Sequence, residues 1–218
     1  MSPTTPEPVL SGSLATEILH QFSESLGTAI DAKDPFTSLH SEEVAEVAHA
    51  IALAMGLDTG DADIIHVAGH LHDIGKIGVP DEVLKKKEPL TDLDWKFIRR
   101  HPETGANILR PVKALAKSGI VDMVRHHHER FDGKGYPGRL KGEAIPRGAR
   151  IIALADALSA ILQNRPYRPA KDFDEAVTEI INCSGTQFDP LVVTAFLRIK
   201  DEIRSILHFL NPDQLDIG

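Results

Sequence analysis

Two short stretches concentrate the side chains that could do chemistry. In "VRHHHERFDGKGYPG", His126, His127 and His128 directly precede a glycine-rich loop. In "HLHDIGK", His72 and Asp73 stand side by side. Imidazole and carboxylate groups are ligands of divalent transition metals. They can bind one together only if they face the same interior, which helical periodicity can test.

Apolar neighbours show which histidines of the first half of the chain face inward, because an α-helix turns about 100° per residue. In "DADIIHVAGHLHDIG", His72 falls on the apolar face. His66 and His70 fall almost opposite that face, so we expect them to point outward. In the preceding helix, His40 shares a face with the apolar residues that follow it.

The same reasoning separates the three consecutive histidines. His127 and His128 extend an inner face, whereas His126 points away from it. Asp156 lies on the apolar face of "ARIIALADALSAIL". A buried carboxylate is very costly unless it is paired or binds a metal. We find no lysine or arginine on the same face as Asp156 or Asp73, so the pattern predicts a metal site between several helices.

Helical periodicity predicts the elements that carry these residues, and no convincing strand is found. The expected fold is all-α, a helical bundle with the metal centre between its helices. Thr91 and Asp94 resemble a capping box, and Pro102 predicts a kink at His101. The expected helices cover about 13–30, 37–55, 60–73, 91–100, 119–130, 146–163, 173–183 and 190–209, with loops at 74–90 and 131–146.

Length and composition indicate a globular protein. The 218 residues are 42% hydrophobic and 26% charged, enough for a full core. No apolar run approaches the ~20 residues of a membrane span, and the start lacks a signal-peptide pattern. The single Cys183 excludes an internal disulfide and a cysteine-rich zinc site. We expect a bacterial-type cytoplasmic protein with an extension over 1–33 and one domain over 34–218.

Charge is distributed unevenly along the chain. The net charge of −8 argues against DNA or RNA polymers as partners. Residues 1–59 contain nine acids and only one basic residue, Lys33, which accounts for that charge. Residues 125–171 carry ten lysines or arginines against four acids. This basic region is either a solvated surface or a binding region for a smaller anionic ligand.

The order of motifs resembles the HD-GYP family of HD-domain metal phosphohydrolases. "HLHDIGK" looks like the histidine–aspartate signature, and "HHERFDGKGYPGRLKGEAIP" carries the Gly135-Tyr136-Pro137 turn that gives the family its name. Further matches follow in the family's order: "DPFTSLHS", "HPETGANIL", "RIIALAD", "RPYR" and "FDP". The resemblance covers roughly residues 34–195.

This resemblance implies an HD-type helical fold and a phosphodiesterase that hydrolyses cyclic di-GMP to linear pGpG, with further cleavage to GMP left open. It also implies two or three metal ions, with Asp73 bridging them. Iron or manganese is the metal that the family suggests, while the ligand types also suit zinc, nickel or cobalt. The implied ligands are His40, His72, Asp73, His101, His127, His128 and Asp156.

Further roles also follow from the resemblance. Lys76 would contact a non-bridging phosphate oxygen, and Arg165 and Arg168 would bind phosphate or guanine edges. The loop of Gly133, Gly135 and Gly138, which permit positive φ, is a rigid connector, a wall of the nucleotide site, or a docking surface for a partner such as a diguanylate cyclase. Dimerisation through the first helix is left open.

The chain departs from the family pattern at three positions. Ser159 stands where a second acid is usual, and Glu43 replaces an arginine after "HS". Phe36 occupies the position of a glutamate in members with three metals, which favours two metals here. Loss of the acid at Ser159 puts full activity in doubt. The alternatives are therefore a weakly active cyclic-dinucleotide sensor, or a phosphodiesterase for another substrate such as cyclic GMP-AMP.

Overall fold

The computed structural model describes residues 12–34, 39–164 and 169–212, and these segments are helical. They contain no strand beyond an isolated bridge between Ser184 and Phe188, so the all-α prediction is confirmed. The elements are α1 (Gly12–Asp31), α2 (His40–Ala54), α3 (Thr59–Leu71), η1 (Ile74–Gly78), α4 (Asp81–Leu84), α5 (Asp92–Ile98), α6 (His101–Leu109), α7 (Lys113–Lys117), α8 (Ile120–His126), η2 (Gly142–Ala144), α9 (Arg147–Leu162), α10 (Phe173–Asn182), α11 (Pro190–Arg198) and α12 (Lys200–Leu210).

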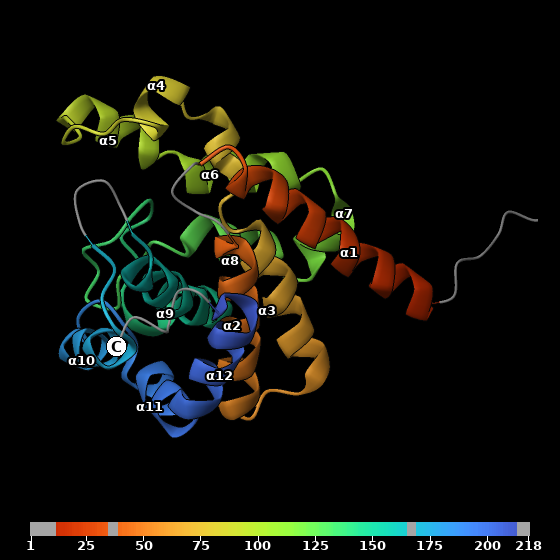
Figure 1. Cartoon of the computed structure of the whole chain (residues 1–218). Helices are drawn as coiled ribbons and strands as arrows, with labels where there is room; N and C mark the ends of the chain where they lie inside the picture. The colour runs from red at the N-terminus through yellow and green to blue at the C-terminus, as the bar shows by residue number, and fades with distance from the viewer. Residues whose placement is uncertain (1–11, 35–38, 165–168, 213–218) are drawn as a thin grey trace, which may run out of the picture.

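Helices α2, α3 and α9 form the centre of the molecule, with α2 packed against both of the others (Figure 1). Their apolar faces are fully buried, as Val47, Ile51 and Ile152 show. The side chains of this core are mainly aliphatic, as the low aromatic content of 5% indicates. This central layer carries His40 and His72 at ends of α2 and α3, and Asp156 within α9.

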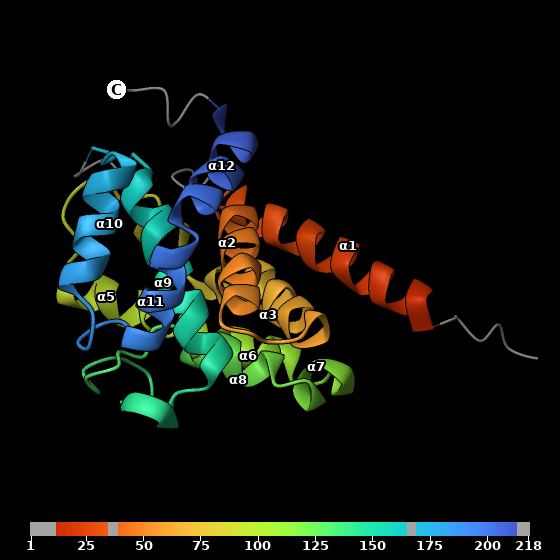
Figure 2. The same cartoon turned by 90° about the horizontal axis from the view of Figure 1, so that it is seen from below.

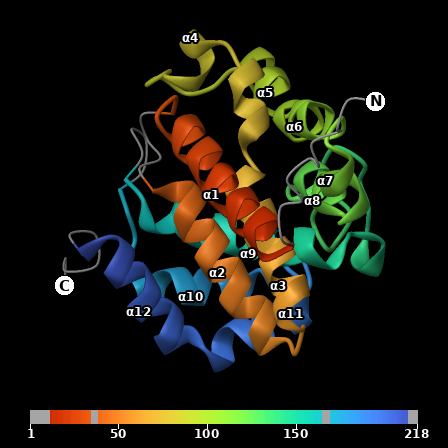
Figure 3. The same cartoon turned by 90° about the vertical axis from the view of Figure 1, so that its right-hand side faces the viewer.

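Helix α1 crosses α2 and α3 and then extends beyond them (Figures 2 and 3). Leu19 and Leu26 pack against the core. A Cβ on Gly27 would lie 2.9 Å from the carbonyl oxygen of His70, so only glycine permits this close approach. Because α1 covers that face of α3, His70 is buried. The prediction that His70 points outward is wrong, since the phase of α3 alone does not reveal a covering helix.

The segment expected as a loop over 74–90 contains η1 and the short helix α4. Together α4 and α5 form an arm that stands apart from the main helical body at the top of Figure 1. The predicted capping box is confirmed: Thr91 Oγ1 accepts from the Asp94 amide, and the Asp94 carboxylate accepts from the Thr91 amide. The break before Pro102 is also present, but α6 begins at His101 itself, with the proline in its first turn.

Other differences lie at short elements. The region after His101 was not expected to be helical, yet α6 and α7 form there. The single helix expected over 190–209 is two helices, because the chain breaks at Ile199. None of the described helices combines the length and apolar character that a membrane crossing requires. The division of the chain at residue 34 stays a prediction.

Candidate metal centre

The seven residues selected as ligands lie together in two adjoining clusters. One cluster contains Asp73, His101, His127 and His128, and the other contains His40, His72 and Asp156. Within each cluster the ligand atoms lie within 4.8 Å of one another. Most members stand at helix ends: His40 begins α2, His101 begins α6, and His72 and His127 follow the last residues of α3 and α8. The packing of these helices therefore sets the geometry.

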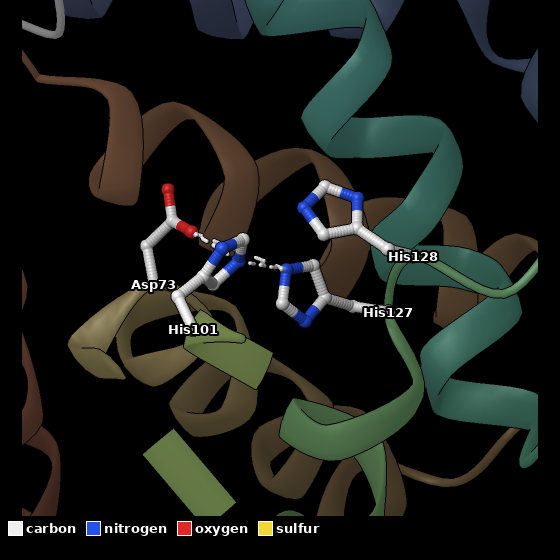
Figure 4. Close-up of side chains that lie close together, drawn as sticks. All are labelled: Asp73, His101, His127 and His128. Carbon is white, nitrogen blue, oxygen red and sulfur yellow. Dashed lines mark hydrogen bonds and ion pairs between the residues drawn. The ribbon is translucent and has the colours of Figure 1, made fainter. Parts of the chain in front are cut away.

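Asp73 lies between the two clusters, and its two oxygens face different histidines. Oδ1 lies 3.1 Å from His101 Nε2 and 4.0 Å from His127 Nε2 (Figure 4). Oδ2 lies 3.4 Å from His72 Nε2 and 3.8 Å from His40 Nε2. One carboxylate thus contacts both groups of imidazoles. This is the arrangement that a ligand shared by two cations requires.

Asp156, from the middle of α9, makes a second connection between the clusters. Its Oδ1 lies 3.3 Å from His40 Nε2, and its Oδ2 lies 3.8 Å from His128 Nδ1. His101 Nε2 and His127 Nε2 approach each other to 3.2 Å. The nitrogen and oxygen atoms therefore converge on a small common space.

The outer nitrogens of four histidines are held by the protein, which orients the inner ones. Nδ1 of His72, His101 and His127 lies 2.6–2.7 Å from the carbonyl oxygen three residues earlier. Nδ1 of His40 lies 2.8 Å from Ser159 Oγ. Each Nε2 is thereby directed at the centre, and that of His72 is buried without a hydrogen-bond partner. Such outer contacts are typical of metal-binding histidines, so the donor set fits a metal.

The protonation states of Asp73, His127 and His128 suit a cation, whereas that of His72 requires loss of a proton. Burial raises the pKa of Asp73, but Lys76 and His72 outweigh it and hold the pKa well below its usual range. Burial and the neighbouring histidines lower the pKa of His127 well below its usual range and that of His128 to about 3. Burial opposes the charged form of His72, yet Asp73 raises its pKa to about 9. A metal would therefore displace a proton from His72.

Lys76 has partners that the sequence did not reveal. Its Nζ lies 2.7 Å from Asp73 Oδ2 and 3.2 Å from Asp34 Oδ2. The expectation that Asp73 has no basic partner is therefore wrong, because η1 turns Lys76 back toward the carboxylate. Burial lowers the pKa of Lys76, but the Asp73 and Asp34 carboxylates outweigh burial and raise it. Lys76 is thus a cation at the edge of the centre.

Two of the unusual residues, Ser159 and Glu43, interact with each other. The Ser159 hydroxyl contacts His40 Nδ1 and donates to Glu43 Oε2 at 2.5 Å. Gln163 Nε2 also donates to this carboxylate, at 3.1 Å. Burial raises the pKa of Glu43, and the hydrogen bonds from Ser159, Gln163 and Asn211 oppose that shift. The carboxylate that is missing at position 159 is thus supplied from α2, through the serine.

The glycine loop is fastened to the residue that follows the histidines. Both oxygens of the buried Glu129 accept from the loop, one from the Gly138 amide at 2.5 Å and one from the Leu140 amide at 3.1 Å. Of the three glycines expected to permit positive φ, only Gly133 adopts it. Gly135 is required by close packing instead, since a Cβ there would lie 2.3 Å from the Arg130 amide. The loop is therefore a rigid part of the site.

The remaining predicted residues have different outcomes. Arg165, Arg168 and Phe36 lie outside the described residues. His126 belongs to neither cluster, and its Nδ1 lies 2.9 Å from the Asp122 carbonyl oxygen. Sequence reasoning missed Asp34, which precedes the histidine motif in "DPFTSLHS" as a lone acid. Only its contact with Lys76 reveals a role.

Besides a cavity of about 360 Å³ that is lined by His127, His128 and Asp156, two more cavities in the described part of the chain border the centre. One, of about 340 Å³, is lined by both clusters, by Lys76 and by the α4–α5 arm. The other, of about 510 Å³, lies beside the glycine loop and is lined by His128, Tyr136 and four basic side chains: Arg99, Arg130, Lys134 and Arg139. Part of the basic region predicted from the sequence thus faces a cavity next to the metal ligands. A small anionic molecule is the natural occupant of such a cavity.

Fold and site together define an all-α protein with a buried histidine–aspartate cluster that is able to bind metal. Residues 24–192 match the HD domain family. The chain belongs to this family, and the resemblance to its HD-GYP branch is confirmed.

Similar proteins agree with this assignment. The chain is 40% identical over 182 residues to the cyclic di-GMP phosphodiesterase response regulator RpfG of Xanthomonas campestris pv. campestris, covering 83% of this chain and 48% of RpfG. It is 34% identical to 3'3'-cGAMP-specific phosphodiesterase 2 of Vibrio cholerae, covering 84% and 35%. The structure of a cyclic GMP-AMP specific phosphodiesterase of V. cholerae, V-cGAP3, superposes with a TM-score of 0.68 at 20% identity, covering 88% and 51%. The chain thus spans about half or less of these relatives.

Proposed function

We propose that this chain is a metal-dependent phosphodiesterase that hydrolyses cyclic di-GMP to linear pGpG. The observation that carries the proposal is the convergence of seven imidazole and carboxylate groups into two adjoining clusters beside a cavity. The name of the X. campestris relative supplies the substrate. A cyclic dinucleotide has no free phosphate end, so hydrolysis needs a water activated and aligned at the site itself.

The clusters would hold two divalent ions, with iron or manganese favoured over zinc, nickel or cobalt. The position of Asp73 between the clusters supports its role as the bridging ligand. Bound ions of this kind lower the pKa of a water and stabilise charge on phosphoryl oxygens. Asp156 and the histidines would orient them.

Lys76 would bind the phosphate. Its ammonium group has three N–H donors, of which two point at Asp34 and Asp73. The third is left for a non-bridging phosphate oxygen in the cavity that Lys76 lines. Arg165 and Arg168 are proposed to contact phosphate or guanine on the strength of their motif alone.

Turnover of the purified chain tests the proposal. Protein loaded anaerobically with Fe(II) or Mn(II) should convert cyclic di-GMP into pGpG, measured by ion-exchange chromatography, and chelator-treated protein should not. The product profile over time would show whether pGpG is cleaved further to GMP. Binding of cyclic di-GMP without any linear product would contradict the enzyme and favour a sensor.

A second substrate has support from the V. cholerae relative, which is named for cyclic GMP-AMP. The same assay should therefore compare cyclic di-GMP with 3'3'-cGAMP at equal concentrations. A higher kcat/KM for 3'3'-cGAMP would reassign the substrate without changing the chemistry.

The setting of the enzyme is part of the proposal. We place the catalytic unit in residues 34–218 and the extension in residues 1–33, in the cytoplasm. Docking of a diguanylate cyclase or another protein on the loop at Gly135-Tyr136-Pro137 remains one of the alternatives for that loop, and dimerisation remains open.

A further inference from the structure

One wall of the 340 Å³ cavity takes no part in the proposed metal chemistry. It comes from the α4–α5 arm and faces the clusters with apolar and aromatic side chains. These are Val83, Leu84, Leu90, Trp95 and Ile98. Trp95 is the single tryptophan of the chain and is 41% exposed. A partly exposed aromatic group on an apolar wall, opposite the charged groups of the clusters, indicates a binding surface.

Trp95 lies at one end of a row of contacting planar groups. The Arg99 guanidinium lies over the Trp95 ring, 5.6 Å from its centroid, and over the Tyr136 ring at 5.8 Å. Tyr136 in turn packs against the His128 ring, with centroids 4.9 Å apart. Planar groups thus run continuously from α5 to the metal centre. An ion pair of 2.6 Å between Lys86 and Asp94 further fixes the arm.

We propose that Trp95 stacks on a purine base of the nucleotide whose phosphate lies at the metal clusters. This inference rests on the proposed function, because it concerns the base of the same nucleotide whose phosphate that function places at the metal clusters. The cavity has a charged floor at Asp73 and Lys76 and an aromatic wall at Trp95. A nucleotide has the same two ends, a phosphate and a base with a π-face. The cavity is small, so it takes one nucleotide of the cyclic molecule.

Stacking on an aromatic ring tolerates any base. Trp95 therefore adds affinity without choosing between guanine and adenine. A change at Trp95 should weaken cyclic di-GMP and 3'3'-cGAMP by similar factors.

Fluorescence of the full, Mn(II)-loaded chain gives a direct test. All tryptophan fluorescence comes from Trp95, because the chain has one tryptophan. Titration with a hydrolysis-resistant phosphorothioate analogue of cyclic di-GMP should quench this emission and saturate. Saturable binding by calorimetry with unchanged emission would overturn the proposal.

Kinetics of two variants give an independent test. Trp95→Ala should raise KM about tenfold or more, as loss of base stacking does, with kcat within about twofold. Trp95→Phe should recover most of the affinity, because phenylalanine still offers a ring. The matched control is Phe97→Ala, since Phe97 is similarly exposed on α5 but does not line the cavity. It should leave KM unchanged.

The outcomes separate this inference from the proposed function. If the wild type turns over cyclic di-GMP and Trp95→Ala leaves KM unchanged, the stacking role is wrong and the phosphodiesterase stands. If the wild type produces no linear product, the proposed phosphodiesterase activity is wrong. The fluorescence titration then still decides whether Trp95 binds the base. An equal KM rise in Phe97→Ala would assign the effect to distortion of α5 and overturn the specific role of Trp95.

Discussion

At the scale of single residues, the Ser159 hydroxyl decides how one of the histidines is oriented. Because Oγ donates its proton to Glu43, it must accept one from His40 Nδ1. His40 then presents the lone pair of Nε2 to the centre, which is the form that binds a metal. The serine therefore links the His40 imidazole to the Glu43 carboxylate by hydrogen bonds.

Ser159→Ala should accordingly weaken metal binding. The change removes the acceptor of His40 Nδ1 and a donor to the buried Glu43. Loss of such an outer contact typically costs about 10- to 100-fold in metal affinity. Competition with a fluorescent chelator for Mn(II) measures this. Ser205→Ala, on the exposed face of α12, is the control and should bind as the wild type does. Unchanged affinity in Ser159→Ala would mean that His40 is oriented by packing alone.

The residues of the site differ in how far the sequence reveals them. His40, His72, His127, His128 and Asp156 share a face with apolar neighbours, so helical phase finds them. Asp73 and His101 stand at element ends, where phase is undefined, and only the family motif selects them. The partners of these residues, such as Glu43 and Asp34, are brought in by other helices. No pattern within one helix can show that.

At the scale of elements, the glycine loop depends on one carboxylate. Glu129 follows the ligand histidines directly and accepts from two loop amides. The metal-ligand histidines and the residue that attaches the loop are therefore neighbours in sequence. Any movement of the loop would also move the end of α8. The loop places Tyr136 against His128, and both residues line the 340 Å³ cavity and the 510 Å³ cavity. The rigidity of the loop therefore matters for both cavities.

Glu129→Ala should destabilise the protein and release the loop. The amides of the exposed Gly138 and the half-buried Leu140 lose a charged acceptor, and a hydrogen bond to a charged group contributes about 1.5–3 kcal/mol. The free energy of unfolding in urea should therefore fall by roughly 2–5 kcal/mol. Hydrogen exchange at residues 138 and 140 should accelerate. Glu143→Ala, at an exposed acid of the same loop, should change stability by less than about 0.5 kcal/mol. Slow exchange at both amides in Glu129→Ala would contradict this role.

The helices themselves were predictable where they are long and amphipathic. The regions of α2, α3 and α9 repeat apolar residues over several turns, and the prediction is accurate to a few residues. The helices α4, α6 and α7 have nine residues or fewer. So short a segment has too few turns for periodicity to emerge, and packing stabilises it instead.

Helix α1 covers a group of histidines outside the metal centre. His20 stacks on His66 with ring centroids 5.3 Å apart, and His66 contacts His70 at 4.7 Å. Burial and, to a smaller extent, the neighbouring His66 lower the pKa of His70 to about 4. Glu46 accepts from His66 at 3.2 Å and opposes this shift. The contact between α1 and α3 therefore favours neutral His70.

This contact makes stability depend on pH. The folded pKa of His70 is depressed, so the unfolded chain binds more protons between pH 6.5 and 4, and stability is lost as pH falls through that range. The loss reaches roughly 3 kcal/mol, since one unit is about 1.4 kcal/mol. His70→Gln cannot be protonated and should lack this part of the dependence. Urea unfolding of chelator-treated protein at pH 7 and pH 5 measures it. Parallel profiles for both proteins would exclude His70 as the cause.

At the scale of the whole molecule, the metal centre joins parts of the chain that are far apart in sequence. Its residues run from His40 at the start of α2 to Asp156 in α9, so bound ions would cross-link most of the bundle. The unfolded chain cannot present these groups together. Metal binding free energy is then also folding free energy.

Removing the metal should therefore lower the melting temperature of the whole protein. A ligand at 100 times its Kd stabilises by about 2.7 kcal/mol, and at about 2–4 °C per kcal/mol for this size the shift is roughly 5–10 °C. Calorimetry with and without Mn(II) measures the difference. His127→Ala should lose most of it, because that imidazole lies inside a cluster. His126→Ala should retain it, since His126 belongs to neither cluster and its Nδ1 contacts the Asp122 carbonyl in the same helix. An equal loss in both variants would show that fold stability, rather than ligation, explains the shift.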